Sequence, residues 1–234
     1  MKKTSILLLG MAMIFTSFGQ QNKTMSAQSK SEVAKQKVKV ESTKQVFEQL
    51  DIILSPFEDM TEFALDKNEK GILESLSKVE QATKESIFKK NLSVENLNLL
   101  TPKIGQLKEL IKQKKYNEIA LASTEIFEFN ISNFVDAKRI ENQVRIEHLD
   151  YMGFKVLALL NQDKIDWAIV KQTIFNVQKE WLALSPKVKD VNLKETFNYL
   201  FKGLILSAEN NDIKTCEILA NMDLTLVDVL ELSI

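Results

Sequence analysis

The sequence predicts an all-α protein, and three observations carry that prediction. The 234 residues include only three prolines and six glycines, so helix breakers are scarce. Apolar residues recur at three- and four-residue spacing along most of the chain, which is the period of amphipathic helices. No short alternating segments lie between turn signals, as strands joined by hairpins would.

The first 19 residues have the form of a cleaved secretory signal. Lys2 and Lys3 precede an apolar run from Ser5 to Phe18, and Ser17 and Gly19 are the small residues that a signal peptidase needs before its cut. An uncleaved membrane anchor is the alternative. We expect an exported protein, periplasmic or secreted, with no stable membrane anchor after cleavage.

Residues 20–31 are polar and aperiodic, and we expect a flexible leader there. The first helix is then expected from about Glu32 to Leu65, interrupted where Ser55 and Pro56 read as a cap followed by a first-turn proline. The expected later elements are a helix at 68–90, a short segment opened by Ser93, a helix started by Thr101 and Pro102 and ending near Lys115, and another beginning at Tyr116 or Asn117.

The chain matches itself when it is shifted by about 94 residues. The shift pairs Leu73 with Trp167, Leu76 with Val170, Ile87 with Trp181, Asn117 with Asn211, Ile119 with Ile213 and Ala122 with Cys216. The match lies in pattern and element order. It predicts two tandem duplicated four-helix-bundle units, repeat 1 at 32–138 and repeat 2 at 139–234.

The join between the expected repeats contains no helix breaker. From Gln106 to Met152 there is neither glycine nor proline, and the stretch around Lys138 is polar with sparse apolar residues. A long continuous central helix linking the bundles is the preferred interpretation. A hairpin near Lys138 that packs the copies side by side is the alternative.

The only two tryptophans, Trp167 and Trp181, lie on one apolar stripe that also holds Val170, Ile174 and Val177. Steps of three and four residues are typical of a helix face that packs against other helices. The stripe therefore predicts core packing rather than a ligand surface, with hydrogen-bond partners for buried indole N–H groups.

His148 is the only histidine, which excludes most metal chemistry. Di-iron bundles use paired carboxylate-x-x-histidine helices, and position 145 is Arg145. Structural zinc needs more histidines or cysteines than this chain has. No dedicated metal site is expected.

Haem binding is the alternative for a carrier function, with His148 and Met152 as its candidate ligands. The segment "LKELIKQKKYNEIALAS" resembles the closing hairpin of cytochrome b562-like exported bundles, over a short part of the chain. The resemblance implies a haem-carrying bundle. That family has an axial histidine near its C-terminus and this chain has none, and it also lacks the C-x-x-C-H attachment motif. No cofactor is therefore expected.

Enzymatic activity is not expected either. The chain has no G-x-S-x-G elbow and no glycine-rich phosphate loop. Cys216 is a lone cysteine on an apolar stripe, where it reads as a small buried residue, with an intermolecular disulfide as the alternative. The sequence thus predicts no catalytic residues.

Composition also bounds the partners. The formal net charge is −1, and only Arg139 and Arg145 are arginines, so nucleic-acid binding is not expected. Phe127 and Phe134 lie in "EIFEFNISNF" and are possible contacts for a partner, with core or inter-bundle packing as the alternative. The expected function is a non-catalytic binding or scaffolding module for a cell-envelope partner or small ligand, bound in a groove between the bundles.

Overall fold

The computed structural model describes residues 27–233, and it confirms the all-helical class: the described residues contain no strand. The chain divides into two compact units, Met1–Lys39 and Val40–Ile234. The first is described only from Ala27, as the start of a helix. The elements are α1 (Ala27–Leu65), α2 (Glu69–Lys84), α3 (Ile87–Asn91), α4 (Val94–Lys112), α5 (Tyr116–Asn133), the short η1 (Ala137–Ile140), α6 (Glu141–Leu160), α7 (Trp167–Leu184), the short η2 (Ser185–Lys187), α8 (Val191–Glu209) and α9 (Ile213–Glu231).

The second unit, Val40–Ile234, contains two apolar cores. The N-terminal core forms where α1, α2, α4 and α5 turn their apolar faces toward one another, and Phe57, Met60, Leu107 and Phe127 are among its members. Helix α3 adds Phe88 to this core, with its ring 6.4 Å from that of Phe57. Burial of such large side chains is the main force that stabilises a helical fold of this kind.

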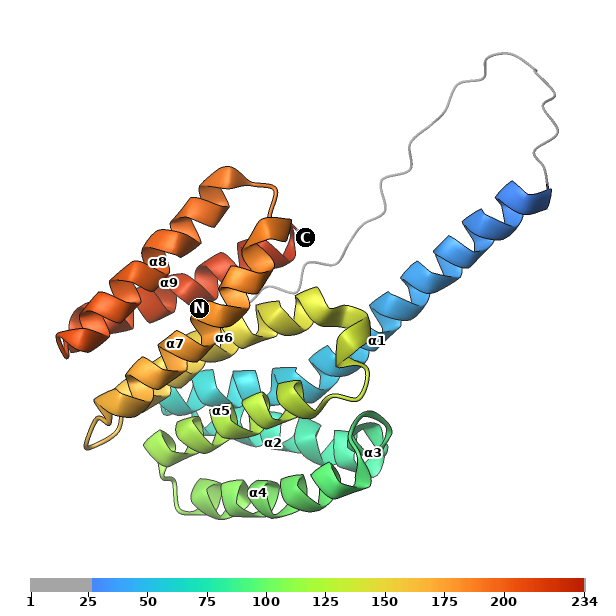
Figure 1. The fold of residues 1–234 in the computed structure, drawn as a ribbon. Coiled ribbons are helices and arrows are strands. Elements are labelled where there is room, and N and C mark those ends of the chain that lie inside the picture. The colour runs from blue at the N-terminus through green and yellow to red at the C-terminus, as the bar shows by residue number, and fades with distance from the viewer. Residues whose placement is uncertain (1–26, 234) are drawn as a thin grey trace, which may run out of the picture. The chain divides into compact units, whose positions relative to one another are not determined.

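The C-terminal core lies among α6, α7, α8 and α9. Each of these helices packs against the next along the chain, and α9 returns to pack along α6 (Figure 1). Trp181 is 1% exposed and stacks on Phe197 with ring centroids 4.5 Å apart. The arrangement is an antiparallel bundle with short connections.

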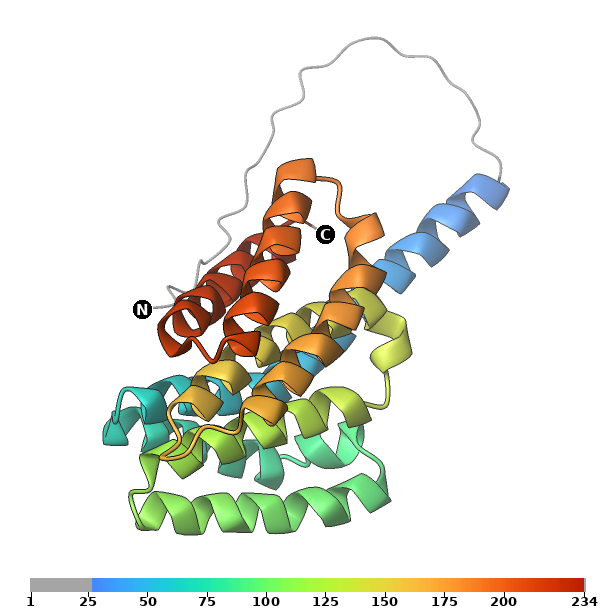
Figure 2. The same ribbon diagram turned by 60° about the vertical axis from the view of Figure 1, so that its left-hand side comes forward.

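Helix α6 joins the two cores. It packs against α5 on one side and against α7 and α9 on others, and both views show it between α5 and the C-terminal helices (Figure 1, Figure 2). Its residues from Met152 to Leu160 are all buried. Leu65, Leu121 and Tyr151 contact both cores, so the halves share an apolar boundary.

The continuous central helix predicted from the sequence is wrong, and the hairpin near Lys138 is the arrangement observed. Helix α5 ends at Asn133, Phe134 adopts an extended conformation, and η1 precedes the start of α6. The backbone N–H of Val135 donates to the carbonyl oxygen of Asn91 at 3.1 Å. No glycine or proline marks this turn. Burial of Phe134 and Ile140 in the N-terminal core stabilises it instead.

Two predicted helix starts are also corrected. Helix α1 continues through Ser55 and Pro56, and α4 begins after Ser93 and continues through Pro102. A proline inside a helix removes one backbone hydrogen bond and weakens the helix locally. In α1 the fully buried Phe57 and Met60 follow the proline, and their packing holds the chain in helical form. Conversely, the helix expected at 68–90 breaks at Ser86, which has a φ of 59°.

The apolar stripe with both tryptophans packs as predicted. Val170, Ile174, Val177 and Trp181 are buried in the C-terminal core, and Trp167 packs partly buried against it. The indole N–H of Trp181 donates to Oδ1 of Asn198 at 2.8 Å. The packing interpretation is confirmed, including the partner that a buried indole needs.

The predicted signal at 1–19 lies outside the described residues, and so do residues 20–26 of the predicted leader. From Ala27 onward the expected leader is helical. Within residues 27–233, no helix combines the length and apolar character that a membrane crossing requires.

Candidate ligand-binding site

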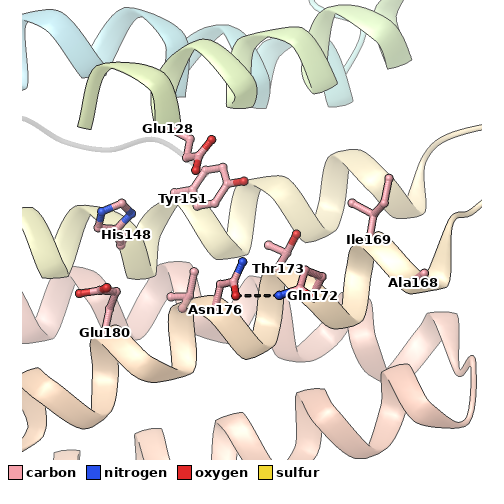
Figure 3. A pocket seen from close by; sticks show the side chains of 10 residues that line it. Glu128, His148, Tyr151, Ala168, Ile169, Gln172, Thr173, Asn176 and Glu180 are labelled. Atoms are coloured by element: carbon pink, nitrogen blue, oxygen red, sulfur yellow. Dashed lines mark hydrogen bonds between the residues drawn. The ribbon is translucent and has the colours of Figure 1, made fainter. Parts of the chain in front are cut away.

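A pocket of about 370 Å³ opens where α5, α6 and α7 meet. Helix α5 from the N-terminal half contributes Glu128, and α6 and α7 from the C-terminal half supply the other nine lining residues (Figure 3). Its lining consists of Glu128, His148, Tyr151, Ala168, Ile169, Gln172, Thr173, Asn176, Val177 and Glu180. The pocket thus lies at the boundary between the two cores, the place expected for a binding groove.

Helix α6 presents a row of polar side chains to this region. Arg145, His148, Tyr151 and Lys155 follow one another at steps of three and four residues, so they lie along one face of the helix. The adjoining face of α6 packs into the C-terminal core through residues such as Leu149 and Val156. The same helix therefore anchors the fold and carries part of the site.

Both cations on this face of α6 are held by carboxylates. Arg145 donates to Glu141 at 2.8 Å and to Glu180 of α7. The Lys155 ammonium is 3.3 Å from a carboxylate oxygen of Glu125 on α5. These contacts link α6 to its neighbours on both sides, and neither cation lines the pocket.

Burial controls the ionisation of the groups in and beside the pocket. It lowers the pKa of His148, although Glu180 opposes the effect, so the imidazole is neutral at neutral pH. Burial raises the pKa of the Tyr151 phenol, which stays protonated as a donor. Burial also lowers the pKa of Lys155 beneath its usual value, while Glu125 and Glu128 favour its charged form.

Helix α7 supplies the second wall because Asp166 fixes where it begins. The Asp166 side chain accepts hydrogen bonds from the backbone N–H groups of Ala168 at 3.0 Å and Ile169 at 3.2 Å. One and two turns later, Gln172 donates through Nε2 to Oδ1 of Asn176 at 2.7 Å, as Figure 3 shows. This bond leaves the Gln172 oxygen and the Asn176 amino group available to a ligand.

No group of three or more His, Cys, Asp or Glu side chains in the described residues is placed to hold a metal ion. Cys216 is a free thiol buried in the C-terminal core, and it does not line the pocket with His148. The pocket lining offers hydrogen-bonding side chains, hydroxyl groups and apolar residues.

Of the candidate site residues predicted from the sequence, only His148 lines the pocket. Met152 is fully buried in the C-terminal core and does not share the site. Phe127 and Phe134 are 1% and 4% exposed and pack in the N-terminal core, so the packing alternative describes them and a surface contact does not.

Sequence reasoning missed Tyr151, Glu128, Gln172 and Asn176. The spacing of Tyr151 from His148 was available as a signal, because three residues along a helix share a face. Glu128 carried no such signal, since only the packing of α5 on α6 brings it to the pocket.

Comparisons with protein families, with characterised proteins and with solved structures found no match for this chain. The class that the geometry defines is an all-helical protein with a mixed polar pocket between two cores.

Proposed function

We propose that this protein is an exported, non-catalytic helical protein that binds a small ligand in the pocket between α5, α6 and α7. The observation that carries the proposal is the pocket itself, in which Glu128 of the N-terminal half faces residues of α6 and α7. Ligand sites favour such boundaries, where a few polar groups fix orientation over an apolar floor. The buried Val177 and the exposed Ile169 are apolar residues of the lining.

A fragment screen read at His148 tests this proposal. The chain has one histidine, so its imidazole proton gives a single NMR signal from the pocket wall. We expect at least one fragment to shift that signal saturably. Asn176→Trp should fill the pocket and weaken binding by about tenfold or more.

Lys179→Trp is the matched control. It places the same bulk on α7 at an exposed position that does not line the pocket. If no fragment moves the His148 signal, or if Asn176→Trp binds as the natural sequence does, the proposed function is wrong.

For the haem-carrier alternative, only one of the two candidate haem ligands lines the pocket. His148 reaches the pocket but Met152 does not, and a second axial ligand would have to come from another helix. Haem titration of the purified protein distinguishes the two proposals, because a Soret band that depends on His148 would favour the carrier.

Export is part of the proposal through the signal at residues 1–19. Mass spectrometry of the protein recovered from its host should give a mature chain that starts near Gln20. An exported chain that retains its first residues would contradict cleavage.

We also propose that the halves are duplicates of one four-helix unit. Asn68 caps α2 and Asp166 caps α7, 98 positions later. Lys115 precedes α5 and Asp212 precedes α9, 97 positions later. Lys114 and Asn211, one residue before those positions, share a φ of 55°. These element starts support a shift slightly longer than the sequence pattern alone indicates. A crystal structure whose halves do not superpose would contradict the duplication.

A further inference from the structure

The charged groups that line the pocket are carboxylates, contributed by opposite walls. Glu128 extends from α5 and Glu180 from α7, while His148 and Tyr151 of α6 lie between them (Figure 3). No lysine or arginine is among the lining residues. A ligand in this pocket therefore meets negative charge on two sides.

The two carboxylates differ in what already holds them. Glu180 accepts a hydrogen bond from Arg145, which also binds Glu141. Glu128 forms no ion pair in the described part of the chain, and it acts only at longer range on Tyr151 and Lys155. Lys155 is 6% exposed and is engaged by Glu125, so it is not free to turn toward Glu128. Glu128 is thus the carboxylate left for a ligand.

The remaining polar groups include several hydrogen-bond acceptors, beside the donors of Tyr151, Thr173 and Asn176. The neutral imidazole of His148 has one acceptor nitrogen, and the Tyr151, Thr173 and Gln172 oxygens add others. The face of the Tyr151 ring can also attract a cation, because an aromatic ring is negative over its faces. Acceptors and negative charge together suit a ligand that brings donors and positive charge.

We propose that the pocket selects small ligands that carry an ammonium group, with Glu128 as the residue that binds the charge. The inference rests on the proposed function and adds to it the chemical class of the ligand. An ammonium group between the walls gains a counter-ion in Glu128 and donates to the surrounding oxygens. An anionic ligand would be repelled by the unpaired Glu128, and no lysine or arginine lines the pocket to bind it.

Three probes of similar size test the class: benzylammonium, benzyl alcohol and benzoate, each titrated at constant ionic strength and followed at the His148 imidazole signal. We expect benzylammonium to bind at least about tenfold more tightly than the other two. Benzyl alcohol or benzoate binding as tightly as benzylammonium would overturn the inference, and the pocket itself would stand.

Variants assign the selectivity to Glu128. Glu128→Gln should weaken benzylammonium binding about fivefold and leave benzyl alcohol unchanged. Glu128→Lys should abolish benzylammonium binding and improve that of benzoate. Glu195→Gln makes the same charge change at an exposed position of α8 and should have no effect. An unchanged affinity in Glu128→Gln would overturn the assignment.

The Asn176→Trp variant shows whether the proposed ligand class is wrong or the proposed binding site is wrong. If fragments of another charge bind in a manner that Asn176→Trp abolishes, the ammonium class is wrong and the proposed function holds. If Asn176→Trp changes nothing for any probe, both proposals fail.

Discussion

Asp223 is a carboxylic acid enclosed in the C-terminal core. It is 0% exposed on α9, and neither carboxyl oxygen has a hydrogen-bond partner in the described part of the chain. Burial raises its pKa well above the ordinary value, and the nearby backbone N–H of Gly153 on α6, which does not meet hydrogen-bond geometry, opposes that shift. An ion could not be accommodated there at low cost, so the native side chain is neutral.

The first prediction concerns the pH dependence that Asp223 imposes. Above the ordinary value of 3.8 the unfolded chain releases this proton while the native state retains it. The unfolded state then binds fewer protons, so the free energy of unfolding falls as pH rises, until the raised native pKa is passed. Denaturant unfolding across this range should show that slope, and Asp223→Asn should remove its contribution.

Asp223→Leu should raise the free energy of unfolding at pH 7 by about 1–3 kcal/mol, because an unsatisfied polar group is replaced by an apolar one. Asp163→Asn, at an exposed loop position, is the control and should change neither quantity. A stability at pH 7 that drops in Asp223→Leu would show that the carboxyl group has a stabilising partner.

At the scale of elements, α6 and α9 approach closely at Gly153. A β-carbon on Gly153 would lie 2.5 Å from a methyl carbon of Leu224 and 3.1 Å from the carbonyl oxygen of Ala220. The backbone carbonyl cannot move without shifting α9 itself. Gly153 therefore sets the spacing between the helices that close the C-terminal bundle.

The second prediction compares two glycines inside helices. Gly153→Ala should lower the free energy of unfolding by about 1–3 kcal/mol because α9 must move outward. Gly105→Ala should raise it by about 0.5–1 kcal/mol, because a β-carbon there meets no atom within 4 Å and alanine favours the helix. Thermal or denaturant unfolding measures both, and equal effects of the two substitutions would contradict the close approach.

Elements that depend on local pattern were predictable from the sequence. The stripe from Trp167 to Trp181 has its own periodicity, and Ser93 has the side chain of a helix cap. The turn at 134–140 was not predictable, since no local breaker marks it and its stability comes from burial of Phe134 against distant helices. Pro56 led to a wrong prediction of a helix start, because tertiary packing keeps α1 helical through a residue that usually interrupts a helix.

The residues of the candidate site also fall into those that the sequence could predict and those that it could not. His148 stood out because the chain has no other histidine, and its chemistry could be judged from that fact alone. Its neighbours Glu128 and Asn176 come from α5 and α7, and they are surface-like glutamate and asparagine residues until the helices pack. A pocket made by three helices is a tertiary property, so composition and spacing could suggest its place between the halves but not its lining.

At the scale of the whole molecule, the shared boundary determines whether the two cores act together. Helix α6 contributes to the C-terminal core and packs on α5, and Leu65, Leu121 and Tyr151 contact both cores. The proposed ligand pocket, which both halves line, needs this boundary to be held in place. We therefore expect the halves to unfold as one cooperative unit.

The third prediction uses the position of the tryptophans to test that cooperativity. Both lie on α7, so tryptophan fluorescence reports on the C-terminal half alone, whereas circular dichroism reports on helices throughout. Leu107→Ala opens a cavity in the N-terminal core and should cost about 2–5 kcal/mol. If the cores are coupled, the fluorescence transition shifts to lower denaturant by the same amount as the circular dichroism transition. Leu182→Ala, at a 60% exposed position of α7, should shift neither. A circular dichroism transition that splits in Leu107→Ala while fluorescence stays in place would show two independent domains, and the pocket walls would then be free to separate.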